Sequence, residues 1–271
     1  MKKRILAAAV LLPLLLLVVL VLPKVFTAIL FGLAAAIGAY ELLCGTGLVK
    51  QPRLTVYGMV MAFLVALSCS LPYPALAMKS AVFVFLCLLF GELLLSRTAL
   101  PFHKVAITFF GGAVIPYCLT ALVRMHGLEY GRFYILLPFV IAFLSDTGAY
   151  FAGRAFGKHK LAPVISPNKT VEGVFGGVLG AIVGVVLYCV VLQTAFDFEV
   201  RYMYALIYGI LGSLGAVFGD LSFSAIKRQT GIKDYGNLIP GHGGILDRFD
   251  SMIVVAPLTE LFMLLIPLVV K

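Results

Sequence analysis

Three polar residues in the second half of the chain have the types and spacing of a reactive helix face. Asp220, Ser224 and Lys227 follow one another at i, i+4 and i+7, and Ser213 extends this face one heptad into an apolar segment. Asp220 should lie roughly 10 Å deeper than Lys227, because a helix rises about 1.5 Å per residue. A carboxylate at such depth is costly and favours a functional site. The alternative is a structural ion pair between Asp220 and a lysine or arginine of another helix.

A glycine-rich turn and two aspartates follow this face. The turn, PGHGG at 240–244, leads into Asp247, Arg248 and Asp250 and then into a ninth apolar run. We expect both aspartates in the first turn of that helix, where helix capping is the alternative explanation for them. Backbone N–H groups of such a turn bind anions, phosphates above all. Two acids beside a phosphate site favour magnesium, which takes one or two protein carboxylates plus phosphate oxygens. The residues expected to surround a phosphate here are His242, Gly243 and Gly244.

A second polar segment joins the sixth and seventh apolar runs. Asp146, Tyr150 and Arg154 form a stripe at i, i+4 and i+8. The connection ends in SPNKT at 166–170, which brings hydroxyl and ammonium donors to a helix start. For Lys158 and Lys160, a solvated basic loop is nearly as good an explanation as a role in phosphate binding. The candidate substrate-binding residues of this segment are Asp146, Ser166, Lys169 and Glu172.

The elements that carry these residues are apolar helices. Of the 271 residues, 62% are hydrophobic and only 12% are charged, whereas soluble domains carry about 25% charged residues. The runs 5–22 and 171–192 lack the polar face of a soluble amphipathic helix. We therefore predict an all-α polytopic integral membrane protein. Its nine predicted transmembrane helices are 5–22, 26–43, 55–71, 76–95, 105–123, 134–153, 171–193, 203–226 and 252–270.

The distribution of charge predicts the orientation of these spans. The chain has 21 lysines and arginines, and most fall at the N-terminus and at the ends of the spans on that same side. The positive-inside rule then places the N-terminus and the connections 154–170 and 227–251 in the cytoplasm. The same rule accounts for the net charge of +9. We interpret 1–133 as a scaffold of transmembrane helices and 134–271 as the catalytic region, with its polar site facing the cytoplasm.

Small residues on the later spans predict close helix packing. Gly173, Gly177, Gly180 and Gly184 share one face of the seventh span. Small residues at this spacing let two helices approach closely, so we interpret these glycines as structural.

The chain resembles the phosphatidate cytidylyltransferase family, also called CDP-diglyceride synthases. The resemblance rests on SAIKRQTGIKDYGNLIPGHGGILDRFD at 224–250, and on SDTGAYFAGRAFGK and SPNKTVEG within 145–173. Length and span count are also similar. Positions of the signature that are filled here, and so become candidate substrate-binding or catalytic residues, are Ser224, Lys227, Arg228, Lys233, Asp234, His242, Gly243, Gly244, Asp247, Arg248 and Asp250.

The resemblance implies an activity and its partners. The reaction would convert CTP and phosphatidate into CDP-diacylglycerol and pyrophosphate, with Mg²⁺ as cofactor. It also implies a homodimer in the bacterial cytoplasmic membrane. The family's metal-binding aspartates fall on Asp220 and Asp247. Lys227, Arg248 and Lys169 would then hold phosphates. The phosphatidate nucleophile is already ionised, so no general base is required.

Two other functions stay open from the sequence. A CTP-dependent polyprenol or dolichol kinase would transfer the γ-phosphate to a lipid alcohol, with Asp146 as the candidate base. A transporter would use Asp146 and Asp220 along an ion path, but the polar residues cluster at one membrane face and no internal repeat is visible.

Overall fold

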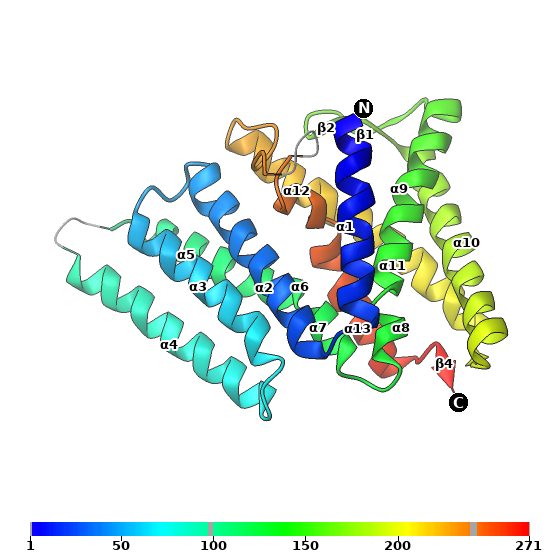
Figure 1. The fold of residues 1–271 in the computed structure, drawn as a ribbon. Coiled ribbons are helices and arrows are strands. Elements are labelled where there is room, and N and C mark those ends of the chain that lie inside the picture. Colours follow the sequence, from blue (N-terminus) through cyan, green and yellow to red (C-terminus); the bar gives the residue numbers. More distant parts are fainter. Residues whose placement is uncertain (1, 97–99, 239–242, 271) are drawn as a thin grey trace. The chain divides into compact units, whose positions relative to one another are not determined.

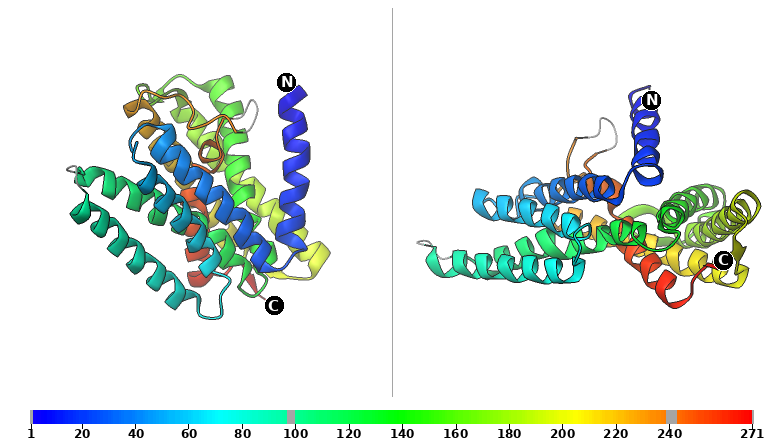
Figure 2. Two further views of the ribbon diagram at one scale, coloured as in Figure 1. Left: turned by 60° about the vertical axis from the view of Figure 1, so that its left-hand side comes forward. Right: turned by 60° about the horizontal axis from the view of Figure 1, so that its bottom comes forward.

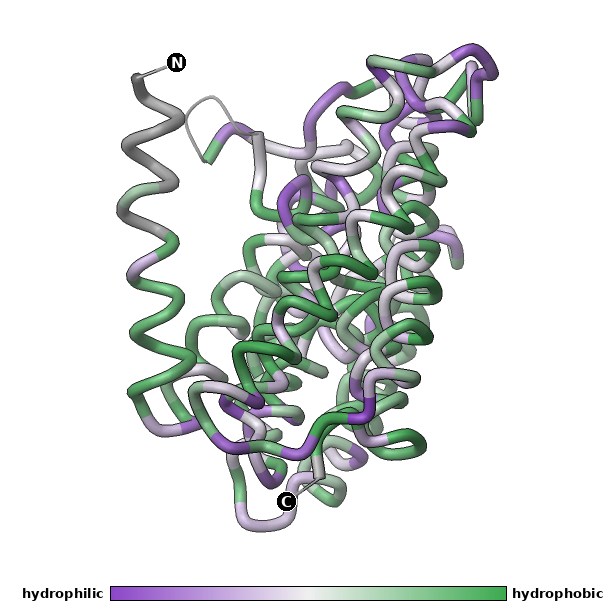
Figure 3. The backbone as a smooth tube through the Cα atoms, turned by 90° about the vertical axis from the view of Figure 1, so that its right-hand side faces the viewer, coloured by the Kyte–Doolittle hydropathy of each residue, from purple (hydrophilic) through white to green (hydrophobic). Residues whose placement is uncertain are grey.

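The computed structural model describes residues 2–96, 100–238 and 243–270. Helices make up most of these residues, and two short antiparallel two-stranded sheets accompany them (Figure 1). Backbone colouring in Figure 3 shows mainly hydrophobic helical turns, with hydrophilic residues gathered at the ends and connections. The chain divides into two compact units, 1–132 with 227–249, and 133–226 with 250–271.

The first unit is built from the N-terminal helices. Its elements are α1 (Lys2–Leu20), α2 (Lys24–Tyr40), the π-helical segment η1 (Glu41–Gly45), α3 (Pro52–Ser68), α4 (Pro74–Leu95), α5 (Phe102–Phe109), the π-helical segment η2 (Phe110–Val114), α6 (Ile115–Leu119), α7 (Ala121–His126) and α12 (Leu246–Phe249). Prolines at the first turns of α3 and α4 favour helix starts there, since the missing N–H has no helical partner anyway. A core of buried side chains centres on Leu43, Leu54 and Leu89.

Segment 227–249 packs against α2 although it lies some 200 residues further along the chain. Leu246 of α12 reaches Gly38 of α2, where an added Cβ would lie 3.5 Å from the leucine side chain. Phe249 makes an edge-to-face ring contact with Phe31 at 6.1 Å between centroids. These apolar contacts hold the signature segment against the N-terminal helices of the unit.

The second unit contains the remaining helices and both two-stranded sheets. Its elements are α9 (Leu137–Phe156), β1 (Lys160–Ala162), β2 (Ser166–Thr170), α10 (Val171–Phe196), β3 (Glu199–Val200), most of α11 (Tyr202–Gln229), α13 (Met252–Leu265) and β4 (Val269–Val270). The short helix α8 (Gly131–Tyr134) spans the unit boundary. β1 pairs with β2 and β3 pairs with β4. The connection 154–170 therefore contains a hairpin, not only a loop.

Glycines set the distance between α9 and α10, which lie side by side (Figure 2). A Cβ at Gly180 would lie 2.5 Å from the Leu144 carbonyl oxygen, and one at Gly177 would lie 3.0 Å from that of Ser145. No larger residue fits at Gly180 without moving a backbone. The structural role predicted for the glycine face of the seventh span is confirmed.

Each predicted span corresponds to a helical segment, with one correction at the end of the chain. Within the described residues, six helices have the length and composition to cross a membrane: Lys24–Gly45, Pro74–Leu95, Phe102–His126, Gly131–Phe156, Val171–Phe196 and Tyr202–Gln229. Helix α13 ends at Leu265, whereas the prediction ran to 270. Pro267 explains the difference, because a proline disfavours helical geometry at the residue before it.

Candidate functional site

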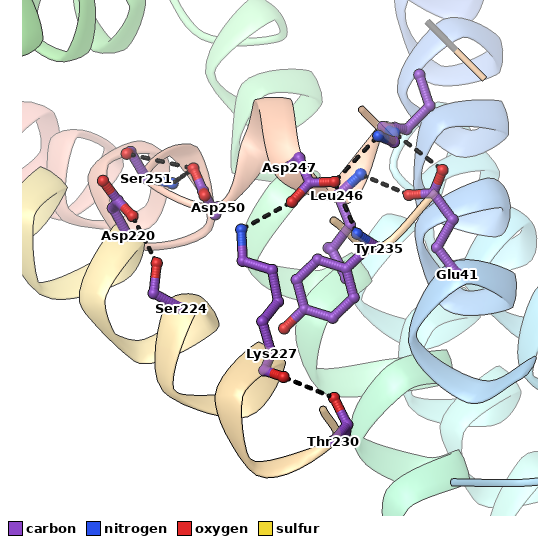
Figure 4. Close-up of polar contacts among 12 residues, drawn as sticks. Glu41, Asp220, Ser224, Lys227, Thr230, Tyr235, Leu246, Asp247, Asp250 and Ser251 are labelled. Carbon is purple, nitrogen blue, oxygen red and sulfur yellow. Dashed lines mark hydrogen bonds and ion pairs between the residues drawn. The ribbon is translucent and has the colours of Figure 1, made fainter. Parts of the chain in front are cut away.

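A buried ion pair forms the centre of the polar cluster in the first unit. Lys227 Nζ donates to Asp247 Oδ1 at 2.7 Å, and the two side chains are only 11% and 3% exposed. The other oxygen of Asp247, Oδ2, accepts the N–H of Tyr235 at 2.8 Å and that of Gly244 at 3.0 Å (Figure 4). Three donors from three parts of the segment thus converge on one carboxylate.

Asp247 does not belong to the helix in which the sequence placed it. It lies in the one-turn helix α12, which ends at Phe249, and α13 begins at Met252. The chain turns at Asp250 and Ser251 between these helices, where Asp250 Oδ1 accepts the Ser251 N–H at 2.8 Å. The two aspartates predicted for the first turn of the ninth helix are therefore separated. Asp247 binds residues of segment 227–249, whereas Asp250 stabilises a local turn.

Gly243 and Gly244 are the described residues of the glycine turn, and the Gly244 N–H has a different partner from the predicted one. Gly243 has a φ of +83°, which favours glycine, and Gly244 is buried. The Gly244 N–H donates to Asp247, so in this arrangement it does not face a phosphate. The phosphate site predicted at Gly244 is corrected here, because the Gly244 N–H already donates to the Asp247 carboxylate. His242 lies outside the described residues.

Glu41 is a member of this cluster that the sequence reasoning missed. Its Oε1 accepts the Ile245 N–H at 3.0 Å, and its Oε2 accepts the Leu246 N–H at 2.8 Å. The residue is 4% exposed and opens the π-helical segment η1. The sequence predicts only a scaffold role for the first five spans. The available signal was that Glu41 is the one carboxylate in the apolar run 24–45, and a carboxylate within an apolar membrane helix is a functional candidate by default.

The second unit contains a separate carboxylate cluster around Asp220. Lys169 Nζ pairs with Asp220 Oδ2 at 2.5 Å, with side chains 26% and 29% exposed. Ser224 Oγ donates to Asp220 Oδ1 at 3.0 Å, as expected for residues one helical turn apart. The alternative explanation for Asp220, an ion pair with a lysine or arginine of another helix, is thus met by a lysine, which comes from strand β2 and not from a helix. This cluster is more open than that around Asp247.

Glu172 holds the connection between α9 and β1. Its Oε1 lies 2.6 Å from His159 Nδ1, and its Oε2 accepts the N–H of Lys158 at 3.1 Å. Glu172 lies in the first turn of α10, and Thr170 caps the start of that helix, since its Oγ1 accepts the Gly173 N–H at 3.1 Å. Glu172 therefore orders the loop that leads to the hairpin containing Ser166 and Lys169.

The remaining predicted residues lie nearer the surface. Tyr150 and Arg154 of the predicted stripe are hydrogen-bonded at 2.9 Å between the guanidinium and the phenol oxygen. The inward-facing residue of this part of α9 is Ser145, whose hydroxyl pairs with that of Ser213 on α11 at 2.7 Å. The exposed candidates are Asp146, Arg228, Lys233, Asp234 and Arg248.

Both carboxylates keep acceptor capacity for a cation. A carboxylate offers about four lone-pair sites. The donors described above occupy two of these on Asp220 and three on Asp247. Among the described residues no group of three or more His, Cys, Asp or Glu side chains is placed to hold a metal ion. Each carboxylate taken singly can still supply an oxygen ligand to a hard cation such as Mg²⁺, which takes one or two protein carboxylates besides water and phosphate oxygens.

The fold and these two clusters define a class of protein. It is a polytopic helical membrane protein with two lysine–aspartate pairs, Lys169 with Asp220 and Lys227 with Asp247, and Asp247 also accepts the Gly244 N–H. Ammonium groups and carboxylates in one protein suit chemistry on anionic substrates.

The comparison with known proteins is specific. Residues 2–266 match the cytidylyltransferase family, and the chain belongs to it. It is 48% identical over 141 residues to a protein of Staphylococcus epidermidis named phosphatidate cytidylyltransferase, covering 52% of this chain and 51% of that protein. A protein of Bacillus subtilis with the same name is 40% identical over 181 residues, 66% of this chain and 65% of the relative. The chain thus spans between half and two thirds of the length of these curated relatives.

Proposed function

We propose that this protein is a phosphatidate cytidylyltransferase, which transfers CMP from CTP to phosphatidate and releases pyrophosphate. The observation that carries the proposal is the family match over residues 2–266, with relatives of that name at 40% and 48% identity. Lysine–carboxylate clusters at the ends of apolar helices support it, because both substrates are anionic and one is a membrane lipid.

The proposed chemistry is an in-line displacement at phosphorus. A phosphate oxygen of phosphatidate forms a bond to the α-phosphorus of CTP while the bond from that phosphorus to the β-phosphate bridging oxygen breaks. The leaving group is pyrophosphate. Catalysis of this kind consists mostly of positioning and charge stabilisation. The nucleophile carries no proton that must be removed, so no residue is assigned as a general base.

Residues of both clusters have distinct proposed roles. Lys169 is partly exposed and can exchange Asp220 for a substrate phosphate. Arg248 is exposed on α12, directly after Asp247, and is proposed to bind phosphate as well. Lys227 is buried against Asp247, and its proposed role is to hold that carboxylate. Ser224 orients Asp220 through the hydrogen bond to Oδ1.

Magnesium is the proposed cofactor, with Asp220 and Asp247 as its protein ligands. Their remaining lone-pair sites support this assignment. A bound Mg²⁺ supplies neutralisation of charge on the nucleotide phosphates. The chain's own part is to present two carboxylates that lysines and backbone N–H groups already hold in place.

The proposed setting is the bacterial cytoplasmic membrane, with nine spans and the polar clusters facing the cytoplasm. The bias in lysine and arginine placement supports this orientation. A homodimer and substrate binding by Asp146, Ser166, Glu172, Arg228, Lys233, Asp234, His242, Gly243 and Asp250 are proposed from the resemblance of the signature.

A product analysis tests the proposed function. Purified protein in detergent micelles is supplied with Mg²⁺, phosphatidate and CTP labelled in the α-phosphate. The expected products are a labelled lipid and free pyrophosphate, and diacylglycerol should not replace phosphatidate. A phosphorylated lipid with CDP as coproduct would identify a kinase instead. Absence of both products would leave the enzyme assignment without support.

A further inference from the structure

Glu41 is a buried carboxyl group near the end of an apolar helix, where burial costs free energy. It is 4% exposed and sits four residues before the end of the apolar span Lys24–Gly45. Burying a polar group in apolar surroundings costs free energy unless hydrogen bonds compensate. Among the described residues, the compensating hydrogen bonds come from backbone N–H groups more than 200 residues away, those of Ile245 and Leu246.

The helix changes from α-helical to π-helical geometry at Glu41. A five-residue π-helical segment, Glu41–Gly45, begins at Glu41. Such segments are rare, and they occur frequently at functional sites because they change the direction of the side chains that follow. Gly45 at the end of the segment would bring a Cβ within 2.7 Å of the Tyr235 carbonyl oxygen. The end of the span and the signature segment therefore approach each other closely.

Two glycines of the signature segment leave room for the Glu41 carboxyl group. A Cβ at Gly236 would lie 2.5 Å from Glu41 Oε1, and a Cβ at Gly244 would lie 2.5 Å from both carboxyl oxygens. Any larger residue at either position would push the carboxyl group away from the N–H groups it binds.

Glu41 and Asp247 share the N–H groups of the turn between them. Three successive N–H groups point to carboxyl oxygens: that of Gly244 to Asp247, and those of Ile245 and Leu246 to Glu41 (Figure 4). Leu246 is the residue directly before Asp247. By fixing both oxygens on this backbone, Glu41 determines where the Asp247 side chain begins and hence how it meets Lys227.

We propose that Glu41 is a positioning residue for Asp247 in the nucleotidyl transfer, acting through the backbone of Ile245 and Leu246. We call the two hydrogen bonds from Ile245 and Leu246 to Glu41 the clamp. The catalytic consequence of the clamp rests on the proposed function, whereas the clamp itself does not. Groups that orient a metal-binding or catalytic side chain typically change metal affinity or activity by about 10- to 100-fold when they are altered.

The test combines Glu41→Gln with a matched control. Glutamine keeps the length of the side chain but replaces one acceptor oxygen by an NH₂ group, which would face a backbone N–H. Glu92→Gln is the control, because Glu92 is also a carboxylate on an apolar helix of this unit, and its partner is the exposed Arg53 at 3.6 Å. Hydrogen exchange of peptides covering 243–250 reports on the clamp, and steady-state kinetics over a magnesium series report on Asp247.

For Glu41→Gln we expect faster exchange at Ile245 and Leu246. We also expect a turnover rate lower by about 10- to 100-fold at saturating substrates, and a higher magnesium concentration for the half-maximal rate. Glu92→Gln should match the wild type in all three. Unchanged exchange would overturn the clamp. Faster exchange with wild-type turnover and magnesium dependence would overturn the positioning role. A wild-type protein that forms no CDP-lipid would instead refute the proposed function, and the exchange data would still decide the clamp.

A second variant keeps the proposal testable should Glu41→Gln fail to fold. Gly236→Ala keeps glutamate at position 41 but presses a methyl group against its Oε1. Exchange at Ile245 and Leu246 should therefore again be faster, and the magnesium concentration for the half-maximal rate should again be higher. Gly91→Ala is its control, since a Cβ there meets nothing within 4 Å. Wild-type behaviour of Gly236→Ala in both measurements would overturn the proposal.

Discussion

Substitution of Asp247 by asparagine tests the buried ion pair, and its effect on stability can be worked out from the contacts. Oδ1 faces the Lys227 ammonium, and Oδ2 faces two backbone N–H groups. An asparagine must place its NH₂ group toward one side or the other. Either it faces the ammonium, or it faces the N–H groups of Tyr235 and Gly244. In both orientations a donor meets a donor, and Lys227 loses its counter-charge.

The expected loss is several kcal/mol. Removing one partner of a buried pair typically destabilises a protein by about 3–5 kcal/mol, because the other charge stays buried without compensation. Both side chains here are at most 11% exposed, so screening by solvent is small. The comparison pair is Arg53 with Glu92, at 3.6 Å and with the arginine 78% exposed. Glu92→Gln should therefore cost less than about 1 kcal/mol.

A double-mutant cycle in detergent micelles measures this coupling. Equilibrium unfolding is followed for Asp247→Asn, for Lys227→Met and for the double variant. We expect the double variant to be more stable than the sum of the single losses predicts, by at least about 1 kcal/mol, because each single change leaves a buried partner uncompensated. Losses that add within about 0.5 kcal/mol would refute the view that Lys227 and Asp247 act as a pair.

The other predictions concern activity and orientation. Asp220→Asn should lower turnover by roughly a thousandfold, since several kcal/mol of transition-state stabilisation would be lost, whereas Asp250→Asn should do less because its carboxylate supports a local turn; turnover over a magnesium series checks both. Lys169→Met should lower kcat/KM for CTP or phosphatidate by about tenfold or more, while Lys160→Met, at the exposed first position of β1, should leave kcat/KM for both substrates unchanged. In a background without native cysteines, Lys160→Cys should react with a membrane-impermeant reagent only from the cytoplasmic side, and labelling from outside alone would contradict the proposed topology.

The sequence by itself determined the positions of the helices and the polar face of α11. Apolar runs locate the helices because any helix that crosses a membrane must cover about 30 Å of hydrocarbon. The contact between Ser224 and Asp220 also follows from spacing, since residues i and i+4 share a helix face. Both are local properties, and local spacing is written in the sequence. The signature between 224 and 250 likewise indicates the family without any tertiary contact.

Only the tertiary structure decided which partners the carboxylates have. The pair of Lys169 with Asp220 joins a hairpin to α11, and the clamp of Glu41 on Ile245 and Leu246 joins two segments over 200 residues apart. The break between α12 and α13, which separates Asp247 from Asp250, is likewise seen only in the structure. A glycine turn offers its N–H groups to whichever acceptor the fold brings closest. In this protein these acceptors are two carboxyl groups of its own chain, those of Asp247 and Glu41. Sequence spacing carries no information about Glu41, which lies more than 200 residues away.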